Sequence, residues 1–535
     1  MRIRTIIAAS LMLALGVMVG GLTQSRWGWV PHARQGDRPR HRPGLDHAGG
    51  WHANDASTDA SDATAVVVAP VVPRVADPEW ATVRAIIAGG GATPELNQIE
   101  IALDLALARE AFGSPAWVLF SSGPGARVQV RDDPPRGDSL IRRLAELFSD
   151  HAGRDAHYAA APIAPHGEGT AERVVASLRA ALAVGDAPLV MYLAAHGEKG
   201  DHPFENRVGL WGDTEITVDD FVRALEAEPT RRMFRVVMTS CHAGGFAEMV
   251  FRGAREANGP SDAQRCGLFA TLWDLEASGC DSNPDRRAHE NYGLHFLQAL
   301  RGLDRDGHPV GTAAIDLDHD GRVGLSEAHA YARIHARSID VPTSTSERWL
   351  RSQVPTAVGM GAPTVALRDD DAVIAELSRT LGVANGLAAA QSTLDATDDR
   401  LHAVNGRIDA LQEVIDGHAR RTRAALLARW PVLDDPWHPD WTTTVRDARG
   451  EIQAQLDHDP GEVAAASVRD EQSRAANEAE PLEVRAALLE RLVRAYENRS
   501  LAAVLRARGG RGWQVFERLR ACEGAPVSPP AIGGR

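Results

Sequence analysis

Through its middle part the chain alternates short apolar runs with longer amphipathic stretches. Five apolar runs have the length of buried strands and cover residues 116–121, 157–161, 188–195, 234–240 and 267–273. The first ordered segment expected is a helix at 95–112, and further helical stretches lie at 139–148, 170–183, 218–228 and 292–300. Strands that alternate with helices indicate a parallel sheet with crossover connections. The sequence therefore predicts an α/β fold with a mainly parallel sheet flanked by helices.

The pattern changes to continuous helical periodicity from residue 366 to residue 525. Apolar residues recur there at heptad spacing, with Val404 and Leu411 between the repeats, and the heptad positions are Leu387, Leu394, Leu401, Ile408 and Ile415. Prolines at 431–439 and at 460 divide the region into helical hairpins. We expect a separate C-terminal helical domain with a coiled-coil arm, followed by a disordered tail at 526–535.

The N-terminal 25 residues have the composition of an export segment. Arg2 and Arg4 precede an apolar run from 5 to 22, and polar residues follow it. Because no Ala-x-Ala site follows the run, both a cleaved signal peptide and a retained membrane anchor remain open. Residues 26–80 are rich in Gly, Asp, Ser, Thr, Ala and Pro and are expected to be a disordered linker. The functional part is therefore expected outside the cytoplasm: periplasmic, membrane-anchored or secreted.

Composition bounds the classes of partner and the number of domains. The 535 residues carry a net charge of −14, and 44% of them are hydrophobic, which fits two or three globular units. No helix or strand shows the stripe of Lys and Arg that nucleic-acid binding needs, so no nucleic-acid partner is expected. None of the four cysteines is in a Cys-x-x-Cys pair. Cys266 and Cys280 are close enough in sequence to form a disulfide across a loop, and Cys522 lies in the far tail.

Two of the apolar runs end in reactive side chains. Residues 188–195 lead into His196-Gly197, and residues 234–240 lead into Cys241 and a glycine-rich turn. If the two strands are neighbours, both side chains meet at one edge of the sheet, where an imidazole can take the proton of the thiol. The amides of Gly197 and Cys241 are the candidate donors to a developing oxyanion.

The order apolar strand, His-Gly, helix, apolar strand, Cys-x-x-Gly resembles the group of cysteine peptidases that contains caspases, metacaspases, legumains and gingipains. The resemblance covers about residues 95–340. It implies a caspase-like sandwich at 81–365 and a cysteine endopeptidase whose catalytic pair is His196 and Cys241. It implies a peptide or protein substrate and no organic cofactor. Transfer of the acyl group to an amine is the related alternative reaction.

The match to individual families in this group is mixed. Residues 206–220 are similar to the legumain-type domain, whereas residues 241–245 look more like the metacaspase version. Legumains carry Asp before the His and an acidic residue after the Cys, where this chain has Ala195 and His242. Metacaspases that cut after basic residues carry Asp where this chain has Thr239. The specificity pocket therefore does not carry over. Its candidate acids are Asp274, Asp281 and Asp285, although a cap or loop role explains each of them more simply.

A separate motif follows the peptidase-like region, at residues 316–327. It places acidic residues at positions 1, 3, 5 and 12 of a twelve-residue loop and glycine at position 6, as in the calcium loop of an EF-hand. The carbonyl of Arg322 would be the ligand from position 7. The alternative is that these residues form an exposed Asp-Gly turn that binds no metal. The sequence predicts a calcium site formed by Asp316, Asp318, Asp320, Arg322 and Glu327.

The alternative to a peptidase is a protein without catalytic activity. In it the caspase-like domain is a calcium-binding scaffold, and the helical region binds partners. In an enzyme the same helical region could instead bind its own catalytic domain as a cover or pro-segment.

Overall fold

The computed structural model describes residues 76–134, 137–148, 156–227, 230–311, 314–354 and 363–526. The expected signal peptide or anchor at 1–25, nearly all of the expected linker and nearly all of the expected tail lie outside these residues. Within the described ranges no helix is long and apolar enough to cross a membrane.

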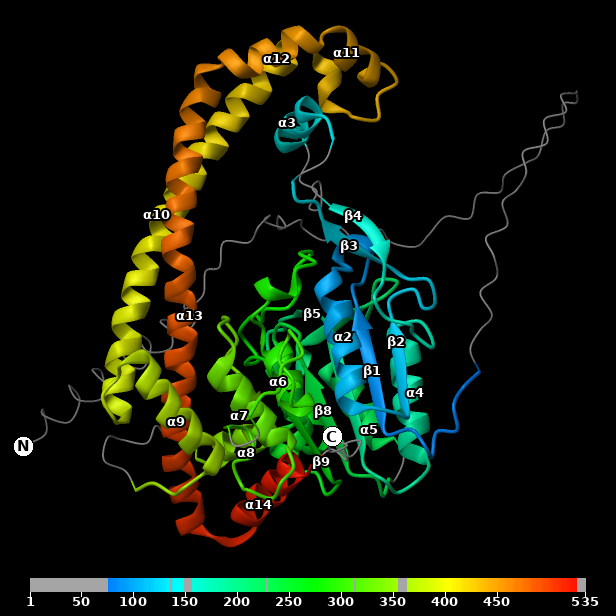
Figure 1. Ribbon diagram of the computed structural model, residues 1–535, viewed down its shortest axis with the longest axis vertical. Helices are drawn as coiled ribbons and strands as arrows, with labels where there is room; N and C mark the ends of the chain where they lie inside the picture. The colour runs from blue at the N-terminus through cyan, green and yellow to red at the C-terminus, as the bar shows by residue number, and fades with distance from the viewer. Residues whose placement is uncertain are drawn as a thin grey trace, which may run out of the picture.

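A mostly parallel sheet forms the centre of the N-terminal half (Figure 1). Its main path runs in the order β10-β9-β8-β5-β1-β2, and all neighbours on it are parallel except β10 and β9. Two further strands extend the sheet from β5 in antiparallel fashion, first β6 and then β7. The strands are β1 (Ala85–Gly90), β2 (Ala116–Phe120), β5 (Leu189–Glu198), β6 (Arg207–Leu210), β7 (Thr214–Thr217), β8 (Phe234–Met238), β9 (Arg265–Phe269) and β10 (Thr343–Ser344).

Helices cover both faces of this sheet, and each face has its own apolar core. On one face lie α4 (Ala171–Ala183) and α5 (Val218–Glu226). On the other face lie α2 (Ile99–Phe112), α6 (Tyr292–Arg301) and α7 (Leu325–His335). The predicted α/β fold with a mainly parallel sheet flanked by helices is thus confirmed. Short 3-10 helices are η1 (Pro94–Leu96), η2 (Pro203–Glu205), η3 (Ala243–Val250), η4 (Arg252–Ala254), η5 (Glu256–Asn258) and η6 (Arg286–Ala288).

Two details of the predicted sheet are wrong. The strand β1 lies in the sheet between β2 and β5, yet its segment was expected to precede the first ordered element. The apolar run at 157–161 is a strand, β4 (Ala156–Ala160), but it pairs only with β3 (Arg127–Arg131) in a separate two-stranded sheet. The main sheet therefore has its histidine strand next to β1, which the alternation pattern did not reveal.

The C-terminal region is helical, and a long antiparallel pair dominates it (Figure 1). The pair consists of α10 (Leu387–Arg429) and α13 (Pro460–Arg508), and we call it the arm. Four of the five predicted heptad residues, Leu394, Leu401, Ile408 and Ile415, are buried. The tip of the arm contains η8 (Pro431–Asp434), α11 (Trp441–Asp447) and α12 (Arg449–His458). The proline breaks at 431–439 and at 460 fall where the sequence places them.

The base of the arm packs into the core of the N-terminal half. At this end the C-terminal helical region is therefore not the separate domain that was predicted. The helices α8 (Thr345–Gln353) and α14 (Gly510–Gly524) share an apolar cluster with residues of η3, β9 and α13. Another cluster joins α7 to α9 (Arg368–Leu381), α10 and α13. Arg491 of α13 is almost fully buried and donates hydrogen bonds to the carbonyls of Arg333, Ala336, Ser338 and Asp340.

A disulfide fastens the last helix to the sheet. Cys266 in β9 is bonded to Cys522 in α14, 256 residues further along the chain. The expected pair of Cys266 and Cys280 is therefore wrong, and Cys280 is a free thiol. The physical reason is that α14 packs directly against β9, a contact between distant segments that cysteine spacing does not report.

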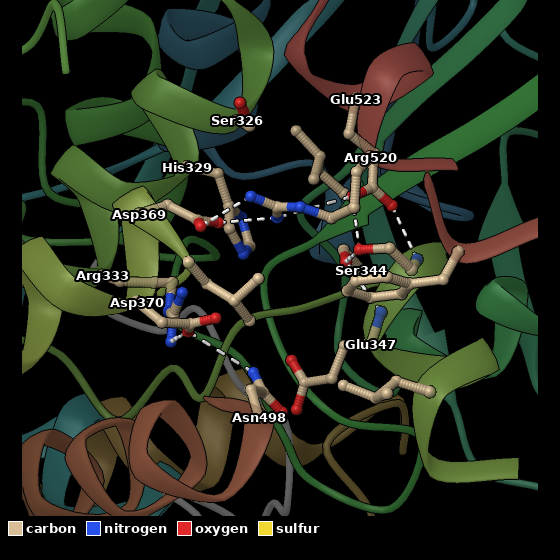
Figure 2. A pocket seen from close by; sticks show the side chains of 15 residues that line it. Ser326, His329, Arg333, Ser344, Glu347, Asp369, Asp370, Asn498, Arg520 and Glu523 are labelled. Carbon is tan, nitrogen blue, oxygen red and sulfur yellow. Dashed lines mark hydrogen bonds and ion pairs between the residues drawn. The ribbon is translucent and has the colours of Figure 1, made fainter. Parts of the chain in front are cut away.

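A network of buried ion pairs lies at the same junction, around a polar cavity of about 20 Å³ (Figure 2). Arg520 of α14 forms a two-bond pair with Asp369 of α9, and Arg333 of α7 pairs with Asp370. Glu523 accepts hydrogen bonds from the start of α8. Buried charges are tolerated only when they are paired, so this network specifies how α7, α8, α9 and α14 fit together.

The tip of the arm holds α3 (Ser139–Phe148), which lies apart from the sheet (Figure 1). Leu140 and Leu144 of α3 are buried in a cluster whose other members belong to the arm. Asp138 pairs with Arg449 at 2.7 Å, and Arg143 pairs with Asp457 at 2.5 Å. The arm therefore contacts the N-terminal half at both of its ends.

Candidate active site

The register of β5 and β8 brings the expected catalytic residues to the same level of the sheet. The two strands are parallel neighbours, and Leu193 lies opposite Met238. His196 is three positions beyond Leu193, and Cys241 is three positions beyond Met238. Both therefore lie at the carboxyl edge of the sheet, where open parallel sheets place their sites.

The strand β5 continues through the histidine to Glu198. His196 and Gly197 remain in β5, where they lie opposite Gly209 and Val208 of β6. Gly197 is needed because a Cβ atom there would lie only 1.9 Å from the carbonyl oxygen of Cys241. The backbones of the two predicted amide donors are thus in close contact.

The amide of Cys241 is free to act as a donor. Among the described residues, no backbone or side-chain oxygen accepts a hydrogen bond from the Cys241 N–H. An unused N–H beside the nucleophilic sulfur is what stabilisation of an oxyanion requires.

A buried asparagine, Asn206, ties together the segments around the nucleophile. Its Nδ2 donates to the carbonyls of His242 and Trp273 at 2.9 and 2.6 Å. Its Oδ1 accepts from the N–H of Gly200, which follows the histidine strand. Asn206 is fully buried and therefore holds the His segment, the Cys segment and the loop after β9 in one arrangement.

The turn after Cys241 is compact. His242 has a left-handed backbone conformation with φ of 58°, which is uncommon for a residue other than glycine. Its N–H donates to the carbonyl of Leu275. Cβ atoms at Gly244 and Gly245 would come within 2.6 and 2.5 Å of neighbouring backbone. The Cys-x-x-Gly-Gly pattern is thus explained by close packing of this turn.

The thiol of Cys241 is neutral in this arrangement. Burial raises its pKa to about 11, and the nearby Glu276 and Asp340 carboxylates act in the same direction, against weaker opposition from hydrogen bonding at Ala277. The sulfur accepts a hydrogen bond from the Ala277 N–H at 3.3 Å and lies 3.5 Å from the Ala277 carbonyl. The thiolate must therefore be generated by proton transfer to a base during the reaction.

The imidazole of His196 is also neutral. Burial lowers its pKa, and the hydrogen bond to Leu96 opposes this effect in part. The Nε2 atom lies 3.0 Å from the Leu96 carbonyl oxygen and 2.9 Å from the side-chain Oε1 of Gln98. A neutral imidazole with one nitrogen occupied leaves the other as a proton acceptor.

The three candidate pocket acids are placed differently. Asp285 caps η6 by accepting a hydrogen bond from the Arg287 N–H, and Asp281 accepts one from the Asn283 N–H. Asp274 is half-buried in the loop after β9 and acts electrostatically on His242. Asp281 and Asp285 thus have the local roles of loop and cap residues, and Asp274 alone lies beside the nucleophile turn.

The structure gathers three of the predicted calcium ligands. Carboxylate oxygens of Asp316, Asp318 and Asp320 lie within 4.8 Å of one another. Glu327 is not in this group, because its carboxylate accepts hydrogen bonds from the N–H groups of Leu317, Asp318 and Gly324. The Arg322 N–H donates to Asp320. The loop thus has acceptor oxygens for a hard cation at positions 1, 3 and 5, and Glu327 would have to turn to complete the set.

A second group of side chains with potential metal ligands was not anticipated. Asp304, Asp306 and His308 also have ligand atoms within 4.8 Å of one another. Asp304 accepts hydrogen bonds from the N–H groups of Asp306 and His308, which is sufficient to explain the turn. The only sequence signal was the Asp-x-Asp-Gly-His spacing itself.

Comparison with known proteins gives no family assignment. No protein-family model matches the chain, and a search of curated proteins found no significant match. Functional conclusions therefore rest on the residues and their geometry.

Proposed function

We propose that the chain is a caspase-like cysteine endopeptidase with His196 as general base and Cys241 as nucleophile. The observation that carries this proposal is that His196, at the end of β5, and Cys241, in the turn after the neighbouring parallel strand β8, follow the paired residues Leu193 and Met238 by the same number of positions. The unused Cys241 N–H and the close approach of Gly197 support it further. The resemblance of the His-Gly and Cys-x-x-Gly segments to this peptidase group supplies the reaction class.

The proposed reaction begins with transfer of the thiol proton of Cys241 to His196. The sulfur then attacks the carbonyl carbon of the peptide bond, and the Cys241 amide, with that of Gly197, stabilises the oxyanion. His196 gives its proton to the leaving amine as the carbon–nitrogen bond breaks, and a thioester remains on the enzyme. Water, deprotonated by His196, hydrolyses the thioester and restores the thiol. Attack by an amine in place of water would give transamidation.

Incubation with a mixed peptide library tests this function. We expect defined cleavage products with the wild-type protein and a loss of at least about 10³-fold in rate for Cys241→Ala, because the alanine side chain cannot form the thioester. Mass spectrometry of the products also detects ligated peptides, which distinguishes transamidation from hydrolysis. Undiminished cleavage by Cys241→Ala, or none by any wild-type preparation, would contradict the proposal.

We further propose calcium as the ligand of the 316–327 loop, since three carboxylates close together repel one another without a cation. Asp320→Asn is expected to weaken calcium binding at least about tenfold, because it removes one anionic ligand. Isothermal titration measures this, with Asp409→Asn on the exposed face of α10 as the control. Equal calcium affinity in the two variants would refute this site. Calcium is expected to stabilise the neighbouring catalytic half.

The location proposed for the protein is outside the cytoplasm. The disulfide between Cys266 and Cys522 supports this, because such bonds persist in oxidising compartments. The composition of residues 1–25 points the same way.

A second candidate function is that of an interaction protein, in which the arm binds a partner. The observation in its favour is Trp437 at the tip of the arm, whose surface is 92% exposed. Large exposed aromatic side chains are common at binding surfaces. This function is compatible with peptidase activity and would stand alone if peptide cleavage were absent.

A further inference from the structure

Gln98 lies at the start of α2 but does not cap that helix. It occupies the N-cap position, where its backbone is extended, and its side chain makes no capping hydrogen bond. The residues usually selected at this position are Ser, Thr, Asp and Asn, whose short side chains reach the first turn. The Gln98 side chain reaches His196 instead, where Oε1 lies 2.9 Å from Nε2.

Two backbone carbonyls determine which nitrogen of His196 carries the hydrogen and how the Gln98 amide is oriented. The carbonyl oxygen of Leu96, 3.0 Å from His196 Nε2, can only accept, so Nε2 must carry the hydrogen. The Gln98 atom facing Nε2 must then also be an acceptor, which is Oε1. The amide nitrogen of Gln98 lies on the other side, 3.5 Å from the Glu95 carbonyl oxygen. Both ends of the amide group are thus consistent with one orientation.

The backbone that carries Gln98 is firmly held. Its neighbour Asn97 is fully buried, and Asn97 Oδ1 accepts a hydrogen bond from the Gly91 N–H after β1. Asn97 Nδ2 donates to the carbonyl of Arg127 in β3. The Asn97 carbonyl accepts from the N–H of Gln129, also in β3. Gln98 is therefore presented to His196 from a fixed position, as orientation of a catalytic group requires.

We propose that Gln98 is a positioning residue that, together with the Leu96 carbonyl, holds the His196 ring with hydrogen on Nε2, so that Nδ1 is the nitrogen that takes the thiol proton. This inference rests on the proposed peptidase function and deepens it. When His196 becomes an imidazolium, its Nε2–H keeps two acceptors, the Leu96 carbonyl and Gln98 Oε1. Both stabilise the transient charge in a site where burial otherwise disfavours it.

A neutral amide suits this role better than a carboxylate. A carboxylate at position 98 would hold the imidazole in its charged form and so would oppose its action as a base. An apolar side chain would leave the Leu96 carbonyl as the only acceptor. The two substitutions therefore move the His196 pKa in opposite directions, which a purely structural role of Gln98 would not do.

The experiment compares the pH profiles of Gln98→Glu, Gln98→Leu and the wild type. Activity that depends on neutral His196 is lost as the pH falls through its pKa, so a raised pKa moves the acidic limb of kcat/KM to higher pH. We expect an upward shift of about 1 pH unit for Gln98→Glu and a downward shift for Gln98→Leu. For Gln98→Leu we also expect kcat to fall roughly 10- to 100-fold, because the ring is less well oriented, with KM changed less than about threefold.

A measurement that needs no activity separates this inference from the proposed function. In a Cys241→Ala background, nitrogen chemical shifts of His196 report its tautomer and pKa by NMR. The expected result is a neutral ring with hydrogen on Nε2, a higher His196 pKa with Gln98→Glu and a lower one with Gln98→Leu. Gln453→Leu, on the exposed face of α12, is the matched control. Unchanged His196 shifts, or acidic limbs that move together in both variants, would overturn the proposal.

Discussion

Replacing His196 by alanine is expected to lower kcat/KM for peptide cleavage by at least about 10³-fold. The reason is that the Cys241 thiol is neutral, with its pKa raised by burial to about 11, and the charged groups that act on it, Glu276 and Asp340, raise the pKa further. Without an imidazole at the same level of the sheet, almost no thiolate forms near neutral pH. Steady-state kinetics on the fastest library peptide measure the loss.

The control for this variant is His402→Ala on the exposed face of α10, which is expected to retain wild-type activity. Added imidazole should restore part of the rate to His196→Ala and none to Cys241→Ala, since it supplies a base but no nucleophile. Activity of His196→Ala within tenfold of the wild type would mean that another group acts as the base.

Replacing Cys522 by serine is expected to lower the free energy of unfolding by about 4 kcal/mol, because the disulfide closes a very long loop. The bond joins β9 to α14, so its loss also loosens the base of the arm. Chemical denaturation with and without a reducing agent measures the effect. Peptide mapping under non-reducing conditions identifies the bonded cysteines directly.

A double-mutant cycle provides the control for the disulfide. Cys266→Ser with Cys522→Ser should cost little more than either change alone, because both remove the same bond. Reducing agent should destabilise the wild type and leave Cys522→Ser unchanged. A peptide that links Cys266 to Cys280, or additive effects of the two substitutions, would contradict the observed pairing.

The strands that carry the reactive residues could be predicted because they are long apolar runs followed by His and Cys. The neighbouring strand β1 could not, because its sequence is Ala-Ile-Ile-Ala-Gly-Gly. Gly89 is required there since a Cβ atom would lie 2.0 Å from the Ala194 carbonyl oxygen. Close packing at the centre of the sheet thus leaves this strand with two β-branched residues, Ile86 and Ile87, among small ones, which is too short a pattern to be recognised as a strand.

The residues that arrange the site were beyond sequence reasoning. Gln98 and Asn206 are ordinary polar residues, and their partners become apparent only when β1, β5 and β8 are side by side. The disulfide was missed for the same reason, since Cys266 and Cys522 are far apart in the chain. The acidic loop could be predicted because its spacing is local. The position of Glu327 could not be predicted, because its carboxylate accepts hydrogen bonds from the loop's own backbone.

In the arm, local periodicity predicts the helices but not the contacts that they make with the rest of the chain. Its heptads predict a long helical pair, and the structure has one. No sequence pattern indicated that its tip would bury Leu140 and Leu144 of α3. Contacts of this kind depend on the path of the whole chain.

The most direct test of the central claim is to identify the residue that bonds covalently to substrate. An electrophilic analogue of the fastest library peptide is incubated with the wild-type protein, and tandem mass spectrometry locates the adduct. We expect one adduct, on the sulfur of Cys241, which forms much more slowly in His196→Ala and is absent in Cys241→Ala. An adduct on Cys280 or on any other residue, with Cys241 unmodified, would contradict the assignment of Cys241 as the nucleophile.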